Sequence, residues 1–142
     1  MMTDDEQVRA AAGLFYEALV RVCNGDSSLM REAWDHGDDV TIAHPMGEWV
    51  KGWAQISVSW DELAIAITKG SVGAKILDVR VLGDVAYAIG VEDATITIGG
   101  REARFHANAT NIFRRKDGVW KMIHHHADRA PSAEAAIDQL AT

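Results

Sequence analysis

Three consecutive histidines, His124, His125 and His126, lie near the end of a chain that has only six histidines. Imidazole groups can bind metal ions or transfer protons, because their ordinary pKa lies near neutral pH. These three fall within a β-forming run, Val119 to Ala127. Neighbouring side chains of a strand point to opposite faces, so the three histidines cannot act together.

Strict alternation divides this run between two faces. One face would carry Trp120, Met122, His124 and His126, and the other would carry Lys121, Ile123, His125 and Ala127. A tetrahedral metal site needs further ligands, and no carboxylate is placed by the sequence to complete one. We therefore predict no metal site, although His106 on the preceding run keeps this alternative open.

His44 is a second candidate for chemistry. It shares one face of a short alternating run with Val40 and Ile42, and Pro45 follows it directly and ends the run. A histidine on an apolar wall can be a general base that needs little adjustment of its pKa. It can also be a buried residue that is hydrogen-bonded to a neighbour. The sequence leaves both interpretations open.

Composition limits the class of protein. The chain has 142 residues, 48% of them hydrophobic, and a net charge of −7, which predicts a single domain, residues 1–142, with one core. Lysine and arginine are scattered, so no basic face for nucleic acid is expected. No apolar run approaches the length of a membrane span, and the acidic N-terminus does not resemble a signal peptide. We expect a cytoplasmic protein with no nucleic-acid or membrane partner.

The elements that must position the histidines follow from hydrophobic periodicity. Three-four spacing predicts helices over residues 4–24, 28–34 and 54–69, the last ended by Gly70 and Gly73. Residues 40–45 predict a short strand. Period-two runs predict strands over residues 74–82, 85–98, 103–115 and 119–127, separated by the hairpin signals Gly83-Asp84, Gly99-Gly100 and Asp117-Gly118.

This order of elements predicts an α+β fold. Three N-terminal helices would pack on one face of a strongly curved, mostly antiparallel sheet. A long, bent sheet of this kind would form a cone-shaped α+β barrel whose mouth is a pocket. A short further helix is expected at residues 131–140.

Several stretches resemble a known family. They are the turn and strand "DDVTIAHP", the helix "GWAQISVSW" and the paired strands "ATNIFRRKDGVWKMIHHHA". Together they resemble the SnoaL-like branch of the nuclear transport factor 2-like superfamily, which includes ketosteroid isomerase, over nearly the whole chain. The superfamily contains cyclases, isomerases, dehydratases, hydrolases, assembly domains and carriers, so the resemblance implies a fold rather than one activity.

The resemblance also implies the positions of the cavity and of a dimer interface. In this fold the face with Ile123 and His125 would line the cavity, and the opposite face of the sheet would pair with a second copy in a homodimer. Trp60 matches a position that faces the cavity. Ile89, Val91 and Asp93 share one face of a central strand and are expected to form its wall. Asp93 would either orient a histidine or lie solvated at the rim.

Ketosteroid isomerase supplies a comparison for the catalytic groups. Its proton-shuttling aspartate precedes a proline, and His44 matches that position. The tyrosine of its oxyanion-stabilising pair matches Ala18 rather than Tyr16. Its protonated acid matches Asn111, whose amide could still donate a hydrogen bond. The isomerase set is therefore incomplete in this chain.

Two classes of function remain. The first is a proton-transfer enzyme of isomerase, cyclase or dehydratase type, in which His44 moves the proton, Asn111 polarises a carbonyl and His125 assists. The second is a non-catalytic ligand-binding or assembly domain, in which these groups satisfy one another or fix a ligand. Either class implies a small, largely apolar ligand, and no cofactor is expected.

Overall fold

The computed structural model describes residues 1–45 and 47–128. Its helices are α1 (Asp4–Val22), α2 (Met30–Ala33) and α3 (Trp53–Ala66). Its strands are β1 (Thr41–Ala43), β2 (Trp49–Lys51), β3 (Ile67–Leu82), β4 (Val85–Ile98), β5 (Arg101–Lys116) and β6 (Val119–Ala127). The helix predicted at residues 131–140 lies outside the described residues. Of the helices described, none is both long and apolar enough to span a membrane.

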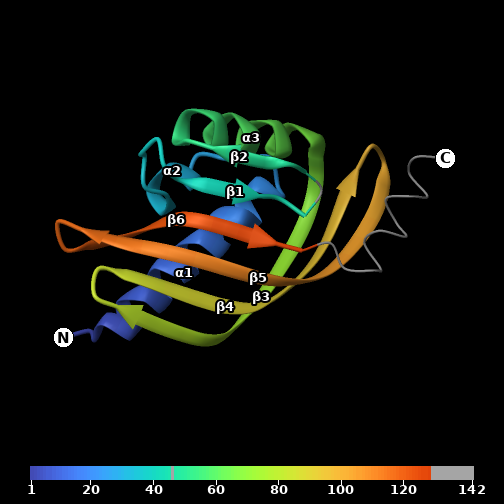
Figure 1. Ribbon diagram of the computed structural model, residues 1–142. Helices are drawn as coiled ribbons and strands as arrows, with labels where there is room; N and C mark the ends of the chain where they lie inside the picture. The colour runs from blue at the N-terminus through green and yellow to red at the C-terminus, as the bar shows by residue number, and fades with distance from the viewer. Residues whose placement is uncertain (46, 129–142) are drawn as a thin grey trace.

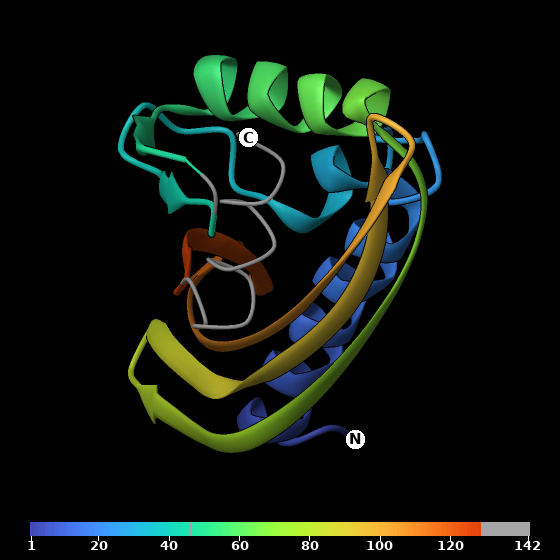
Figure 2. The ribbon, with the colours of Figure 1, turned by 90° about the vertical axis from the view of Figure 1, so that its right-hand side faces the viewer.

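The strands form one six-stranded mixed sheet in the order β2-β1-β6-β5-β4-β3. Only the β1–β6 pair is parallel among the pairs of described strands. The sheet bends strongly, so that the β4–β5 hairpin rises beside α3 (Figures 1 and 2). The predicted α+β class is confirmed, with the helices preceding most of the sheet. The described sheet is open, since the edge strands β2 and β3 do not pair, so the expected cone-shaped barrel is not closed.

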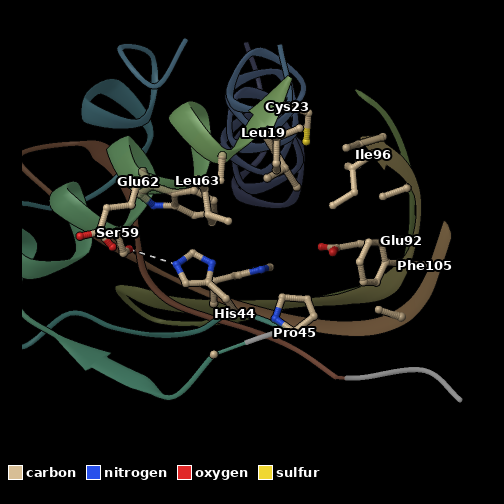
Figure 3. Close-up of a pocket in the computed structure, with 18 residues that line it drawn as sticks. Leu19, Cys23, His44, Pro45, Ser59, Glu62, Leu63, Glu92, Ile96 and Phe105 are labelled. Atoms are coloured by element: carbon tan, nitrogen blue, oxygen red, sulfur yellow. Dashed lines mark hydrogen bonds between the residues drawn. The ribbon is translucent and has the colours of Figure 1, made fainter. Parts of the chain in front are cut away.

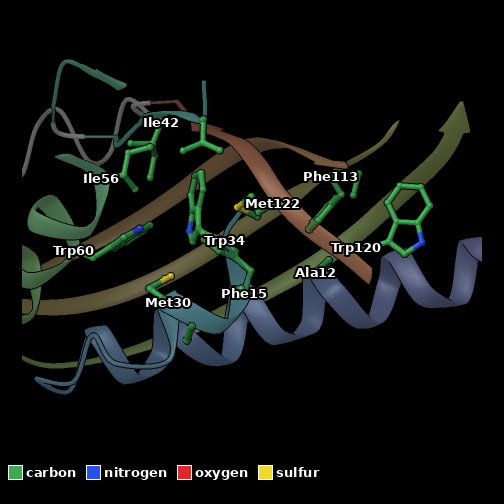
Figure 4. Close-up of a cluster of buried hydrophobic side chains, with 14 of the residues drawn as sticks. Ala12, Phe15, Met30, Trp34, Ile42, Ile56, Trp60, Phe113, Trp120 and Met122 are labelled. Carbon is green, nitrogen blue, oxygen red and sulfur yellow. The ribbon is translucent and has the colours of Figure 1, made fainter. Parts of the chain in front are cut away.

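The core lies between α1 and the sheet. α1 begins at Thr3, whose hydroxyl accepts a hydrogen bond from the backbone N–H of Glu6. Its buried residues recur every three or four positions, as one helical face requires. They are Val8, Ala12, Phe15, Ala18 and Val22, each with 0% exposure. This face meets Trp34, Phe113 and Met122 (Figure 4), and burial of these large side chains provides most of the driving force for folding.

β6 contains a bulge that the sequence analysis did not include. Ile112 of β5 pairs with His124, but the next residue, Phe113, pairs with Met122. Ile123 is therefore an extra residue with no partner across the ladder. A bulge of this kind restarts the alternation of side chains on the bulged strand.

The bulge changes which side chains share a face. Trp120 is 6% exposed and Met122 is 0% exposed, so both point into the core. His125 points to the same side. The prediction that Trp120 and Met122 lie on the outer face with His124 and His126 is wrong, because strict alternation fails at the bulge.

Two boundaries near α3 also differ from the prediction. The helix ends at Ala66 and β3 begins at Ile67, so Gly70 lies within a strand rather than after a helix. A Cβ at Gly70 would lie 2.9 Å from the Cβ of Cys23, so glycine lets β3 pass close to the end of α1. β2 was not predicted, and it forms an antiparallel pair with β1.

Candidate functional site

A cavity of about 330 Å³ lies between the C-terminal end of α1, α3 and the bent part of the sheet (Figure 3). This volume is at the lower end of the usual range for small-molecule sites. The wall is mostly apolar and includes Leu19, Cys23, Trp60, Leu63, Ile67, Ile96 and Phe105. The polar side chains on the wall are His44, Ser59, Glu62, Glu92 and His125.

His44 follows β1 directly, and its side chain reaches α3. Its Nε2 lies 3.0 Å from Oγ of Ser59, and that hydroxyl donates its hydrogen to the carbonyl oxygen of Ile56 at 2.7 Å. Ser59 can therefore only accept from His44, so Nε2 carries the hydrogen and Nδ1 carries a lone pair. The other ring nitrogen points into the cavity in Figure 3. Burial lowers the pKa of His44 to about 4, so the ring is neutral at pH 7.

His125 lies on β6 and is only 2% exposed. Its Nδ1 donates a hydrogen bond to Oδ1 of Asn111 over 2.5 Å, and its ring lies 4.8 Å from that of Phe15. Burial, with a smaller contribution from His44, lowers the pKa of His125 to about 3. This histidine is also neutral at pH 7.

Asn111 connects His125 through Tyr16 to a buried acid on β4. Its Nδ2 donates to the hydroxyl of Tyr16 at 3.0 Å, and that hydroxyl donates to Oε2 of Glu92 at 2.6 Å. Burial, with the Glu92 charge second, raises the pKa of Tyr16. Burial is also the main cause that raises the pKa of Glu92 above its usual range. The chain from His125 to Glu92 thus joins β6, β5, α1 and β4.

The structure brings several of the predicted site residues together. His44, His125 and Trp60 line the cavity, and the Trp60 ring meets the His44 ring edge-on at 4.6 Å. Asn111 is not on the wall but lies behind His125. Ile123, predicted to bind ligand, is the bulge residue and packs against the core cluster instead.

The resemblance to ketosteroid isomerase matched the wrong residue of α1. Tyr16, not Ala18, provides the hydroxyl that meets Asn111, and Ala18 is buried in the core. The match with Ala18 gave the approximate position along the helix but not the helical face. Positions 16 and 18 point in directions about 200° apart on an α-helix.

The predicted orientation of β4 is also wrong. Ile89 is 39% exposed and the Asp93 side chain is 71% exposed, so both point away from the cavity, and Val91 shares their parity. The small residues Ala86 and Ala88 face the core instead. Small side chains on this face let α1 approach the sheet closely, which a row of Ile and Val would prevent.

Two functional candidates were missed in the sequence. Glu92 is 7% exposed and lines the cavity, and Ser59 fixes the ring of His44. The position of Glu92 could have been predicted, since it has the same parity as Ala94 and Ile96 on the buried face of β4. The role of Ser59 could not, because a serine within an amphipathic helix is common.

The outward histidines have separate contacts. His124 hydrogen-bonds through Nδ1 to Oγ1 of Thr41 at 2.7 Å, and Trp49 stacks on it with ring centroids 5.6 Å apart. His106 pairs with Asp93 at 2.7 Å. Across residues 1–45 and 47–128, no group of three or more His, Cys, Asp or Glu side chains is placed to hold a metal ion.

Comparisons with solved structures identify the class of fold. A ketosteroid isomerase-like protein from Erwinia carotovora atroseptica superposes with a TM-score of 0.79 at 15% identity, over 92% of this chain and 100% of that chain. At this identity the likeness shows the fold alone. Helices packed on a bent, mixed sheet are the architecture that both proteins share.

Two solved structures are similar at higher identity. A proposed dehydratase of the nuclear transport factor 2-like family from Streptomyces avermitilis is 28% identical, with a TM-score of 0.78, over 89% of this chain and 96% of that chain. A proposed calcium/calmodulin-dependent protein kinase type II association domain from Thiobacillus denitrificans is 27% identical, with a TM-score of 0.69, over 86% of this chain and 94% of that chain.

The family itself is shown by a family model. The model of the SnoaL-like domain matches residues 8–130, and the chain belongs to this family. A comparison with curated proteins found no match.

Proposed function

We propose that this protein is a proton-transfer enzyme of isomerase, cyclase or dehydratase type, which acts without a cofactor on a small, largely apolar substrate in a cone-shaped pocket. One observation carries the proposal. The imidazole of His44 is fixed by Ser59 at one nitrogen and directs its other nitrogen into an apolar cavity (Figure 3). A neutral ring with a free lone pair is the arrangement that a general base requires.

The surroundings of His44 support this role. Apolar walls exclude water, which strengthens the electrostatic effect of each polar group on a bound substrate. The Glu92 carboxyl group lies on the opposite side of the cavity and can face the developing positive charge on His44 (Figure 3). The Streptomyces avermitilis protein, a proposed dehydratase at 28% identity, agrees with this class of reaction.

Asn111 has a different role from the one that the sequence suggested. Both ends of its amide are engaged, by His125 and by Tyr16, so it acts by holding the His125 ring. We place Asn111 as a positioning residue and His125 as the second cavity group that contacts substrate.

The test is turnover by a His44→Gln variant. We would screen hydroxylated, carbonyl and epoxide compounds for turnover, and then compare the variants on the best substrate. Loss of a general base lowers kcat by roughly 10²–10⁴-fold, with a much smaller change in KM. His36→Gln is the matched control, because His36 is an exposed histidine outside the cavity wall and should retain wild-type kcat. Wild-type turnover by His44→Gln would refute the proposal.

A non-catalytic binding domain is the second candidate, and the low pKa of the two cavity histidines favours it. A base with a pKa of about 4 is weak, so these rings could serve only as hydrogen-bond acceptors for a ligand. The Thiobacillus denitrificans structure, a proposed association domain at 27% identity, supports the related alternative of an assembly domain. Ligand binding without turnover of any compound in the screen would favour the binding domain.

We further propose that the protein forms a homodimer through the outer face of the sheet. Cross-strand partners share a face, and the register assigns to this outer face Tyr87, Ile89, Val91, His106, Asn108, Thr110, Ile112, His124 and His126. The set mixes apolar, aromatic and polar side chains, as many dimer interfaces do. Trp120 and Met122, which were first assigned to this interface, are replaced by the apolar residues of β4.

A further inference from the structure

The hydrogen atoms of the cavity wall can be located by following each hydrogen bond to its end. At His44 the chain of hydrogen bonds has only two links. The Ser59 hydroxyl donates to the Ile56 carbonyl, and Nε2 of His44 therefore donates to Ser59. Nδ1 is left as an acceptor, and no described side chain donates to it. His44 therefore presents a lone pair, and no N–H, to a ligand.

At His125 the chain of hydrogen bonds runs through three further residues. The hydroxyl of Tyr16 donates to the carboxylate of Glu92, so its oxygen must accept from the Asn111 amide. This places Nδ2 of Asn111 towards Tyr16 and Oδ1 towards His125. Nδ1 of His125 therefore carries the hydrogen, and Nε2 is a second lone pair. The hydrogen bond to Glu92 thus determines the tautomer of a ring on another strand.

Glu92 adds a third acceptor. Its Oε2 accepts from Tyr16, which leaves Oε1 of the carboxylate without a described donor. The carboxyl group points into the cavity in Figure 3. The neutral state of both rings follows from their lowered pKa values, so neither becomes an N–H donor near pH 7.

Donors are nearly absent from the described part of the wall. The Ser59 hydrogen is used, and the N–H of Trp60 is buried away from the cavity surface without a partner. The thiol of Cys23 remains, and a thiol is a weak donor. The backbone N–H of Gly47 is bonded to the carbonyl oxygen of His44.

We infer that this cavity accepts hydrogen bonds but donates almost none, and that its ligand is a neutral, largely apolar molecule that carries hydroxyl groups. The inference rests on the proposed function in taking this cavity as the ligand site, but it does not require catalysis. A hydroxyl group supplies the hydrogen that the lone pairs of His44 and His125 lack. A ketone, an ether or a carboxylate would place acceptor against acceptor and leave buried groups unpaired, which weakens binding by roughly 10-fold for each group.

The first test needs no ligand. Nitrogen-15 NMR of the histidine rings at pH 7 should show hydrogen on Nε2 of His44 and on Nδ1 of His125, and carbon-13 NMR should show Glu92 as a carboxylate. In a Tyr16→Phe variant the link to Glu92 is lost, so His125 should become a mixture of tautomers while His44 is unchanged. The opposite tautomer at His125, or a protonated Glu92, would overturn the inference and leave the proton-transfer proposal standing. The opposite tautomer at His44 would overturn both, because it removes the lone pair that a general base requires.

The second test compares ligands of matched size by calorimetry. The probes are 2,7-naphthalenediol, its dimethyl ether, 1,4-naphthoquinone and 2-naphthoate. The diol should bind at least about 10-fold more tightly than each of the others, since one unpaired buried group is worth this much. In Glu92→Leu, which removes the third acceptor, the preference for the diol should fall.

The outcomes separate the two proposals. Equal affinity for the ether or the quinone would overturn the preference for hydroxyl groups but would confirm the cavity as a ligand site. Binding of none of the four probes would overturn both the inference and the cavity's role as a site for small apolar ligands.

Discussion

Burial, rather than a neighbouring cation, holds the pKa of both cavity histidines below the usual value. Desolvation disfavours the charged imidazolium, so each ring stays neutral while it is enclosed. A ligand that fills the cavity would remove more water from His44 and strengthen this preference. Both rings are therefore hydrogen-bond acceptors in the folded protein, and both are weak bases.

The lowered pKa values predict how stability depends on pH. Between pH 6.5 and about 4, His44 and His125 are protonated in the unfolded chain but neutral in the folded protein. The free energy of unfolding should therefore fall as the pH falls. Each histidine contributes at most about 1.4 kcal/mol per pH unit. The two contribute equally down to about pH 4, and the contribution of His125 continues to about pH 3.

Urea denaturation at pH 7, 6 and 5 would measure this slope. In His44→Gln the free energy of unfolding should depend less steeply on pH, because unfolding takes up as much as one proton fewer. A pH dependence equal to that of the wild type would contradict the prediction. Glu92 acts in the opposite direction, because its raised pKa favours the folded state at low pH and weakens it as the pH rises. The free energy of unfolding of Glu92→Gln, compared with that of the wild type, should therefore be more favourable at pH 8 than at pH 5.

At the scale of elements, β3 contains a bulge where it pairs with β4. The register between β3 and β4 shifts between Ile76 and Asp78, and Gly90 lies opposite Ile76. A Cβ at Gly90 would overlap the carbonyl group of Lys75. Glycine therefore permits the close approach of two strand backbones at this bulge.

Gly90→Ala should lower the free energy of unfolding by about 2–4 kcal/mol, because the backbone of β3 cannot move without breaking its ladder. Urea denaturation would measure the change. Gly13→Ala is the matched control, since Gly13 is exposed on α1 and a Cβ there would meet nothing within 4 Å. That variant should gain about 0.5–1 kcal/mol from higher helix propensity. Equal stability of Gly90→Ala and wild type would show that the bulge does not require glycine.

The turns could be predicted from the sequence, and the bulges could not. Asp117 and Gly118 both have positive φ, which local residue chemistry signals directly. The bulge at Ile123 has no such signal, because it depends on how β5 and β6 pack around Trp34 and α1. His125 was found because it lies on the expected side of its strand, and His44 was found because it directly precedes a recognisable proline. Glu92 was missed because the wrong face of β4 was chosen.

On the scale of the whole molecule, the outer sheet face predicts a homodimer. Thr110 is exposed on β5 and pairs with His126, near the centre of that face. Thr110→Arg should place two like charges across the two-fold axis and shift the protein to monomer at tens of micromolar in sedimentation experiments. Val58→Arg on the exposed side of α3, where Val58 is 49% exposed, should leave the dimer intact. A monomeric wild type would refute the proposal.

The bulge at Ile123 also separates two kinds of mutational tolerance along a single strand. Before it, Trp120 and Met122 belong to the core that holds α1, so substitutions there should unfold the chain. After it, residues 124–127 meet the cavity and the outer face. A library that varies only this second half should give many folded proteins with altered ligand preference. In this way a single unpaired residue would let a family diversify its chemistry without redesigning its fold.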